Sequence, residues 1–194
     1  MYFCPIKQHV MTLLDTIKIT KTENSKINEI DFDNLSFGSV FSDHMLISTY
    51  RNGAWETPEI TPYKPITLDP SSKIFHYGQS IFEGMKAYKD KDENIFLFRP
   101  EDNCKRLNIS AKRMAIPEIP EAFFMDGLKA LLKLDSDWIP TKDGSSLYIR
   151  PFMFASGNGF HASPADEYKF IIATAPSGSY FSGKVRVRIA EKYA

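Results

Sequence analysis

The segment SSLYIRPFMF, residues 145–154, carries the clearest strand pattern in this chain of 194 residues. Side chains alternate between the two faces of a strand, so Tyr148 and Arg150 share one face while Leu147 and Ile149 share the other. The expected strand therefore has one apolar face suited to a core. Its opposite face presents a phenol beside a guanidinium.

Further strands are expected on both sides of this segment. The apolar run YKFIIATAP, 168–176, follows it after a loop that contains several Gly and Ser residues. Upstream, Asn52-Gly53 separates two β-prone runs, and because both central residues of a type I′ turn need positive φ, this dipeptide indicates a hairpin. Residues 81–88 and 94–98 are predicted to pair as a second hairpin around the charged turn KDKDEN.

Two helices are expected between the hairpins and the last strands. The first begins at Pro100, has acidic residues in its first turn and ends before Pro117. The second covers about 121–134. Helical spacing predicts the buried faces, which are Cys104, Leu107, Ala111 and Met114 in the first helix and Phe124, Leu128, Leu131 and Leu132 in the second. This order of elements predicts an α+β fold, with an antiparallel sheet and two helices on one face.

The composition limits the classes of protein to consider. With 43% apolar residues the chain can bury a core. Its formal net charge is zero, so it lacks the excess of positive charge typical of proteins that bind nucleic acid or an anionic membrane. Cys4 and Cys104 lie far apart and form no disulfide or zinc pattern, so no metal is expected. There is no signal-peptide pattern and no apolar run of bilayer length, so the expected location is the cytoplasm.

The N-terminal residues 1–34 differ from the rest of the chain. They are polar, rich in Lys and Asn, and weakly periodic. We therefore expect an N-terminal extension with little packing of its own, followed by a globular domain from Leu35.

Two arginines are candidates for anion binding, and each has a structural alternative. Tyr148 and Arg150 offer a carboxylate a hydroxyl and a bidentate guanidinium, or else Arg150 pairs with a nearby Asp or Glu. Arg106 lies beside the apolar stripe of its helix. There it could hold a phosphate or carboxylate, or it could be an ordinary surface arginine.

The segment HYGQSIFEGMKAY, residues 76–88, could form part of a pocket. Tyr77, Phe82 and Gly84 could line apolar walls, or they could belong to a packed strand with a glycine bulge. His76 has no Ser, Cys or carboxylate at the spacing of a catalytic triad, so a structural role is expected. The chain contains no G-x-G-x-x-G or P-loop motif for a nucleotide.

Five segments follow one another along the chain: FGSVFSDHML, HYGQSIFEGMKAY, LFRPEDNCKRLNISAKRM, SLYIRPFMF and APSGSYF. Together they resemble the branched-chain amino acid aminotransferases, which are fold-type IV enzymes that use pyridoxal phosphate. The resemblance runs from about Leu35 to the end of the chain. It implies a small substrate-covering domain at 35–178, then a linker and the first strand of a truncated cofactor domain at 179–194.

The resemblance also implies roles for individual residues. Arg106 matches the arginine that holds the cofactor phosphate, and Tyr148 and Arg150 match residues near the substrate carboxylates. Aromatic positions around the aliphatic side chain of the substrate are matched by Phe37, Tyr77, Phe82 and Tyr180. Phe160 and Ala162 match positions that reach the neighbouring subunit, so a homodimer is implied.

The activity implied is transamination of Leu, Ile or Val with 2-oxoglutarate. In that family the Schiff-base lysine lies in a Lys-x-Gly-Gly-Asn-Tyr-like segment, and none of the 194 residues match it. No catalytic residue is therefore expected here, and the chain alone is expected to be inactive and not to bind pyridoxal phosphate. The alternatives are a type IV enzyme acting on D-amino acids or aminodeoxychorismate, or a non-enzymatic dimerising or regulatory domain.

Overall fold

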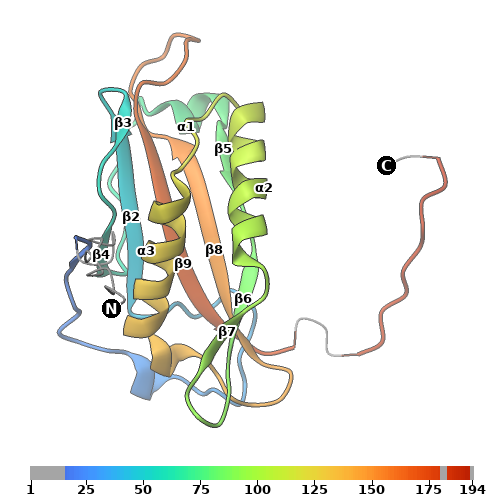
Figure 1. The fold of residues 1–194 in the computed structure, drawn as a ribbon. Helices are drawn as coiled ribbons and strands as arrows, with labels where there is room; N and C mark the ends of the chain where they lie inside the picture. Colours follow the sequence, from blue (N-terminus) through green and yellow to red (C-terminus); the bar gives the residue numbers. More distant parts are fainter. Residues whose placement is uncertain (1–15, 180–182, 193–194) are drawn as a thin grey trace, which may run out of the picture.

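The computed structural model describes residues 16–179 and 183–192, and its framework is one sheet (Figure 1). The long strands β8 (Ser146–Ala155) and β9 (Tyr168–Ser177) pair antiparallel along their whole length, which confirms the two predicted strands. The other strands are β1 (Lys18–Ile19), β2 (His44–Arg51), β3 (Ala54–Trp55), β4 (Glu59–Pro62), β5 (Ser80–Phe82), β6 (Met85–Lys89) and β7 (Ile95–Leu97). Their order is β1-β4-β2-β9-β8-β6-β7, with β3 beside β2 and β5 beside β8.

The sheet is mixed because one edge pair is parallel. β1 and β4 run parallel, whereas the other pairs among the described strands are antiparallel. β1 belongs to the N-terminal segment, and that segment packs more than its weak periodicity indicates: Ile17 is buried, and Ile27, Ile30 and Phe32 lie against the core. The α+β fold is confirmed, and the expectation of an antiparallel sheet is wrong at this edge. The domain limits at 34 and 178 stay a prediction.

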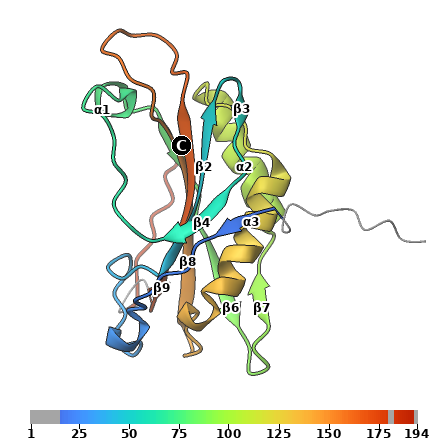
Figure 2. The same cartoon turned by 90° about the vertical axis from the view of Figure 1, so that its left-hand side faces the viewer.

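Two long helices cover one face of the sheet. Figure 2 shows α2 (Pro100–Arg113) and α3 (Glu121–Leu134) on one side and the short α1 (Lys73–Tyr77) on the other. The 3-10 turns are η2 (Ile27–Glu29) and η3 (Ser136–Trp138). α2 and α3 confirm the two predicted helices. Sequence reasoning did not predict α1, which ends at Gly78 in the left-handed region at φ 63°.

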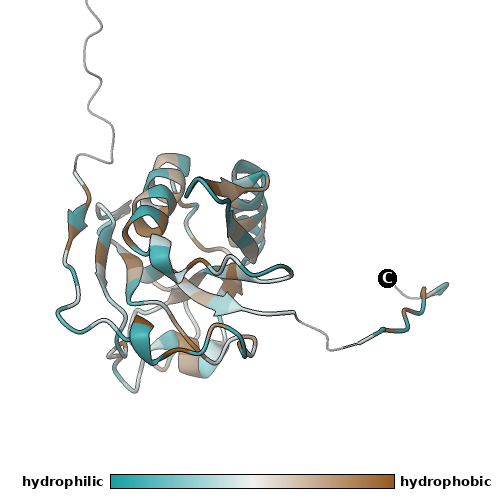
Figure 3. Ribbon diagram, turned by 90° about the horizontal axis from the view of Figure 1, so that it is seen from below, coloured by the Kyte–Doolittle hydropathy of each residue, from teal (hydrophilic) through white to brown (hydrophobic). Residues whose placement is uncertain are grey.

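The predicted buried faces of both helices are confirmed with one exception. Cys104, Leu107 and Ala111 of α2 are buried, as are the four predicted residues of α3. Met114 is 40% exposed, because α2 ends at Arg113 and the chain turns away before the next helical step. In Figure 3 the helices carry both brown and teal residues, as expected of helices with one buried face.

The first predicted hairpin is confirmed, and the second differs in one respect. Asn52 and Gly53 both have positive φ, 53° and 83°, and they join β2 to β3. β6 and β7 also pair as a hairpin. The predicted single strand at 81–88 is wrong, however, because β5 and β6 are separate strands that both pair with β8.

Pro151 explains this interruption. The N–H and C=O of one residue in an antiparallel strand point to the same neighbour. The carbonyl of Pro151 accepts a hydrogen bond from Glu83 N at 2.8 Å, so the missing N–H of Pro151 also belongs on the side of β5 and β6. The ladder is interrupted at Glu83 and Gly84, although the register is kept, with Phe82 opposite Phe152 and Met85 opposite Ile149.

The described residues 183–192 contain no helix or strand, and Figure 1 shows them apart from the sheet. Within the described part of the chain, no helix combines the length and the apolar character needed to cross a bilayer.

A buried polar pair ties the end of α3 to the start of β2. The carboxylate of Asp135 accepts hydrogen bonds from His44 N at 3.0 Å and His44 Nδ1 at 2.6 Å. Thr22 N donates to His44 Nε2 at 2.9 Å, so the ring proton is on Nδ1. Burial raises the pKa of Asp135 above its ordinary value of 3.8, although the hydrogen bonds from His44 oppose the shift.

Replacing Asp135 with Ala should lower the free energy of unfolding by about 1–3 kcal/mol, since the buried donors of His44 lose their acceptor. Urea unfolding of the variant and of the unmodified chain measures the difference. Asp137→Ala is the matched control, because this exposed aspartate lies two residues away. Equal stability of the Asp135 and Asp137 variants would contradict the account.

Candidate functional site

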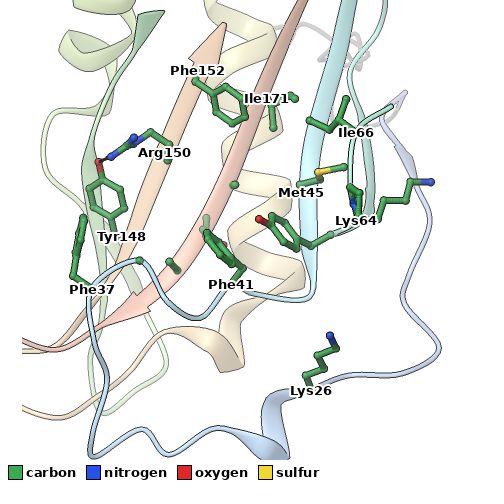
Figure 4. Close-up of a pocket in the computed structure, with 16 residues that line it drawn as sticks. Lys26, Phe37, Phe41, Met45, Lys64, Ile66, Tyr148, Arg150, Phe152 and Ile171 are labelled. Carbon is green, nitrogen blue, oxygen red and sulfur yellow. Dashed lines mark hydrogen bonds between the residues drawn. The ribbon is translucent and has the colours of Figure 1, made fainter. Parts of the chain in front are cut away.

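A pocket of about 730 Å³ opens on the face of the sheet opposite α2 and α3 (Figure 4). β8 contributes Tyr148, Arg150 and Phe152, and β9 contributes Ile171, Ala173 and Ala175. The period of two places each set on one face of its strand. Much of the remaining wall is apolar and comes from Phe37, Phe41, Met45, Tyr63, Pro65 and Ile66.

Tyr148 and Arg150 lie together at this wall, as the alternation predicts. Nε and Nη2 of Arg150 donate to the Tyr148 hydroxyl at 3.0 and 2.8 Å. The Arg150 guanidinium also lies 4.3 Å from the centre of the Phe82 ring. Among the described residues, no Asp or Glu forms an ion pair with Arg150. The guanidinium therefore keeps its charge available to an anion in the pocket.

The two residues between β5 and β6, Glu83 and Gly84, touch this pair through the glycine. A Cβ added at Gly84 would lie 2.7 Å from the Tyr148 hydroxyl oxygen, which is closer than real Cβ contacts come. A larger residue at this position would therefore displace the phenol or the backbone. Gly78 differs: a Cβ there meets nothing within 4 Å, so it is needed only for its positive φ at the end of α1.

Arg106 lies outside the pocket, beside a shallow recess of about 410 Å³ that Phe98 and Arg99 also line. Its Nε and Nη2 donate to Oε1 and Oε2 of Glu83 at 2.5 and 2.8 Å. Glu83 is buried, whereas the Arg106 side chain is 66% exposed. Burial favours a higher pKa for Glu83, but hydrogen bonds from Arg106, Asn103 and the Gly84 N–H outweigh it and lower the pKa below 4.5.

Tyr77, Phe160 and Ala162 belong to a separate cluster at one end of the sheet. The Tyr77 hydroxyl, on α1, donates to the backbone oxygen of Phe160. The Phe160 side chain is 72% exposed, and Ala162 is exposed as well. The same loop is held by the buried Lys73, whose Nζ donates to Ser163 O, Ser163 Oγ and Pro164 O at 2.8, 2.6 and 3.0 Å.

The structure thus brings together only part of the predicted site. Phe37 lines the pocket, and its ring centre lies 4.8 Å from that of Tyr148. Phe82 and Gly84 contact the Tyr148–Arg150 pair but are not among the residues that line the pocket. Tyr180 lies outside the described residues. Within the described part of the chain, no group of three or more His, Cys, Asp or Glu could hold a metal.

Sequence reasoning missed Glu83 and the stacked pair Phe41 and Tyr63, whose ring centres lie 4.8 Å apart. A carboxylate inside the apolar run SIFEGM was the available signal for Glu83, because a buried charge requires a partner. No comparable signal marked the stacked rings.

Known proteins resemble this chain in sequence, although no protein-family model matches it. Branched-chain-amino-acid aminotransferase 2 of Bacillus subtilis is 44% identical over 177 residues, which are 90% of this chain and 48% of the relative. The branched-chain-amino-acid aminotransferase of Mycolicibacterium smegmatis is 41% identical over 169 residues, 86% of this chain and 46% of the relative. The chain is homologous to the branched-chain aminotransferases. It corresponds to their N-terminal region and spans about half the length of these relatives.

Solved structures of branched-chain aminotransferases share the fold. The Escherichia coli enzyme matches with a TM-score of 0.52 and 25% identity, over 69% of this chain and 40% of that one. The enzyme of Thermoproteus uzoniensis, solved with norvaline, matches with a TM-score of 0.54 over 71% of this chain and 43% of that one. Its 22% identity supports the fold alone.

Branched-chain aminotransferases use pyridoxal phosphate, and the donors at Arg106 fit the phosphate of this cofactor. The pair with Glu83 uses Nε and Nη2, which leaves Nη1 outside the pair on a largely exposed side chain. A guanidinium with a free donor edge suits a phosphate oxygen.

Gly84→Ala should lower the free energy of unfolding by about 1–3 kcal/mol, because the added methyl group must displace the Tyr148 phenol or the backbone. Urea unfolding measures the loss. A matched control is Gly183→Ala, since a Cβ at Gly183 meets nothing within 4 Å. A Gly84 variant as stable as the Gly183 variant would show that the glycine is not required.

Glu83 should make stability depend on acid pH. Its pKa in the folded chain is lowered, so its contribution is present above the ordinary value of 4.5 and is lost as the pH falls through the lower folded value. Glu83→Gln should therefore show a shallower loss of stability below pH 4.5, measured by urea unfolding at several pH values. Glu23→Gln, at an exposed position, should keep the slope of the unmodified chain.

Proposed function

We propose that the full-length protein containing this chain transfers the amino group of Leu, Ile or Val to 2-oxoglutarate. The proposal is supported by 44% identity to a branched-chain aminotransferase over 90% of the chain. It rests above all on one structural observation, the Tyr148–Arg150 pair at the wall of an apolar pocket.

The pocket has the mixture that two different substrates require. A branched aliphatic side chain needs apolar walls, which Phe37, Met45 and Ile171 supply. Glutamate and 2-oxoglutarate carry a second carboxylate, and its charge needs a cationic partner in the same space. Arg150 provides this cation, and the Tyr148 hydroxyl and the Phe82 ring hold its guanidinium in place.

Arg106 would hold the cofactor through its phosphate. When bound, pyridoxal phosphate supplies an electron-withdrawing ring that accepts the electrons of the bond broken at the α-carbon of the amino acid. Arg106 would fix the ring by its charged phosphate, and Arg150 would orient the substrate by its carboxylate. We assign no catalytic group to the 194 residues and expect the chain alone to be inactive.

The proposal includes a homodimer in which Phe160 and Ala162 reach the site of the neighbouring subunit. The exposure of both residues on one anchored loop supports this arrangement. The cytoplasmic location stays a prediction.

A transamination assay on the full-length protein tests the activity. Amino transfer to 2-oxoglutarate is expected from Leu, Ile and Val. Activity only on D-amino acids or aminodeoxychorismate would overturn the proposal in favour of a related type IV enzyme. A full-length protein without any of these activities would favour a dimerising or regulatory domain.

Arg150→Met in the full-length protein should raise the KM for 2-oxoglutarate about 10-fold or more, because a charge-assisted hydrogen bond contributes about 1.5–3 kcal/mol. The KM for leucine should change by less than about threefold, since apolar contacts bind its side chain. Steady-state kinetics with each substrate varied separately measures both values. Arg113→Met, at an exposed position on α2, is the control, and an equal rise of both KM values would contradict the role of Arg150.

A further inference from the structure

Arg106 is an unusual surface arginine because its partner is buried. About two thirds of its side chain is exposed, yet Glu83 beneath it has only 5% of its side chain exposed. A long exposed side chain loses conformational entropy when it is fixed, so surface arginines commonly sample several rotamers. Here two parallel hydrogen bonds to one carboxylate define the plane of the guanidinium.

Glu83 is itself held by groups other than Arg106. Its backbone N–H donates to Pro151 O at 2.8 Å, at the break between β5 and β6. Oε2 also accepts hydrogen bonds from Asn103 Nδ2 at 3.0 Å and from Gly84 N at 3.1 Å. These hydrogen bonds hold the Glu83 carboxylate in place, and the carboxylate in turn orients the Arg106 guanidinium.

We propose that Glu83 is a positioning residue that presents the free edge of the Arg106 guanidinium to a phosphate group at the recess beside α2. The assignment of this phosphate to pyridoxal phosphate rests on the proposed function. Asn103 has a supporting part, since it lines the recess and bonds the same carboxylate oxygen as Arg106 Nη2.

Two effects of Glu83 on a bound phosphate have opposite signs. Its negative charge repels the phosphate, so removing the charge strengthens binding if electrostatics alone decides. Its hydrogen bonds fix Arg106 in advance, so removing them weakens binding if orientation decides. Asp102 also lies at the recess and pairs with Arg99 and Lys105. Its charge is unchanged when Glu83 is replaced, so it does not affect the comparison. The sign of the change on replacing Glu83 therefore separates the two effects.

The test uses the full-length protein with inorganic phosphate and pyridoxal 5′-phosphate as probes, followed by ¹⁵N NMR of the arginine Nε–H signals. Glu83→Gln keeps the size of the side chain, removes its charge and replaces one of the two acceptor oxygens by an NH2 donor, so the two parallel hydrogen bonds to Arg106 cannot both form. The hydrogen-bonded shift of the Arg106 Nε–H signal should decrease in this variant, and phosphate affinity should fall about 2–10-fold, as expected for fixing one long side chain. Lys112→Met, an exposed neighbour on α2, should change neither.

The outcomes distinguish this inference from the proposed function. Arg106→Met should abolish the phosphate response, and an unchanged affinity there would overturn both the cofactor contact and the positioning role. Tighter phosphate binding by Glu83→Gln, with Arg106→Met still impaired, would overturn only the positioning role. An unmodified full-length protein whose Arg106 signal does not respond to either probe would overturn the anion site at the recess.

Discussion

A single missing hydrogen-bond donor interrupts the sheet between the two candidate anion sites of this protein. Pro151 has no N–H, and it lies in β8, which pairs with β9 on one side and with β5 and β6 on the other. The neighbouring strand is interrupted at this point by Glu83 and Gly84, which follow Phe82 at the end of β5. Each of these three residues contacts a different candidate group. Phe82 stacks on Arg150 and Gly84 passes beside Tyr148 at the pocket, whereas Glu83 binds Arg106 at the separate recess.

One face of the sheet packs the main core, and the other face borders the pocket. The face under α2 and α3 carries the large core, in which Leu46, Phe124 and Ile149 are fully buried. The opposite face has a small cluster around Met45, Phe154 and Ile171, and much of its apolar surface borders the pocket. Because side chains alternate along β8, the same strand contributes residues to the core on one face and to the pocket on the other. Changes on the pocket face can therefore alter binding while the main core stays intact.

Local signals in the sequence predicted much of the fold. Pro100, the acidic first turn and the apolar spacing determine α2, and Asn52-Gly53 determines its hairpin, because these signals act within a few residues. The break at Glu83 was missed because it depends on Pro151, which lies far along the chain. The candidate sites show the same difference between local and long-range signals. The alternation of side chains along one strand was enough to place Tyr148 beside Arg150, whereas the contact between Glu83 and Arg106 depends on how α2 packs against the sheet.

The loop that carries Phe160 is fastened to α1 by the ammonium of Lys73 and the hydroxyl of Tyr77. A loop held in this way loses little further conformational freedom when another surface meets it. Association through Phe160 would then resemble the docking of a rigid projection rather than the folding of a flexible arm. Such a projection would change its backbone little on docking.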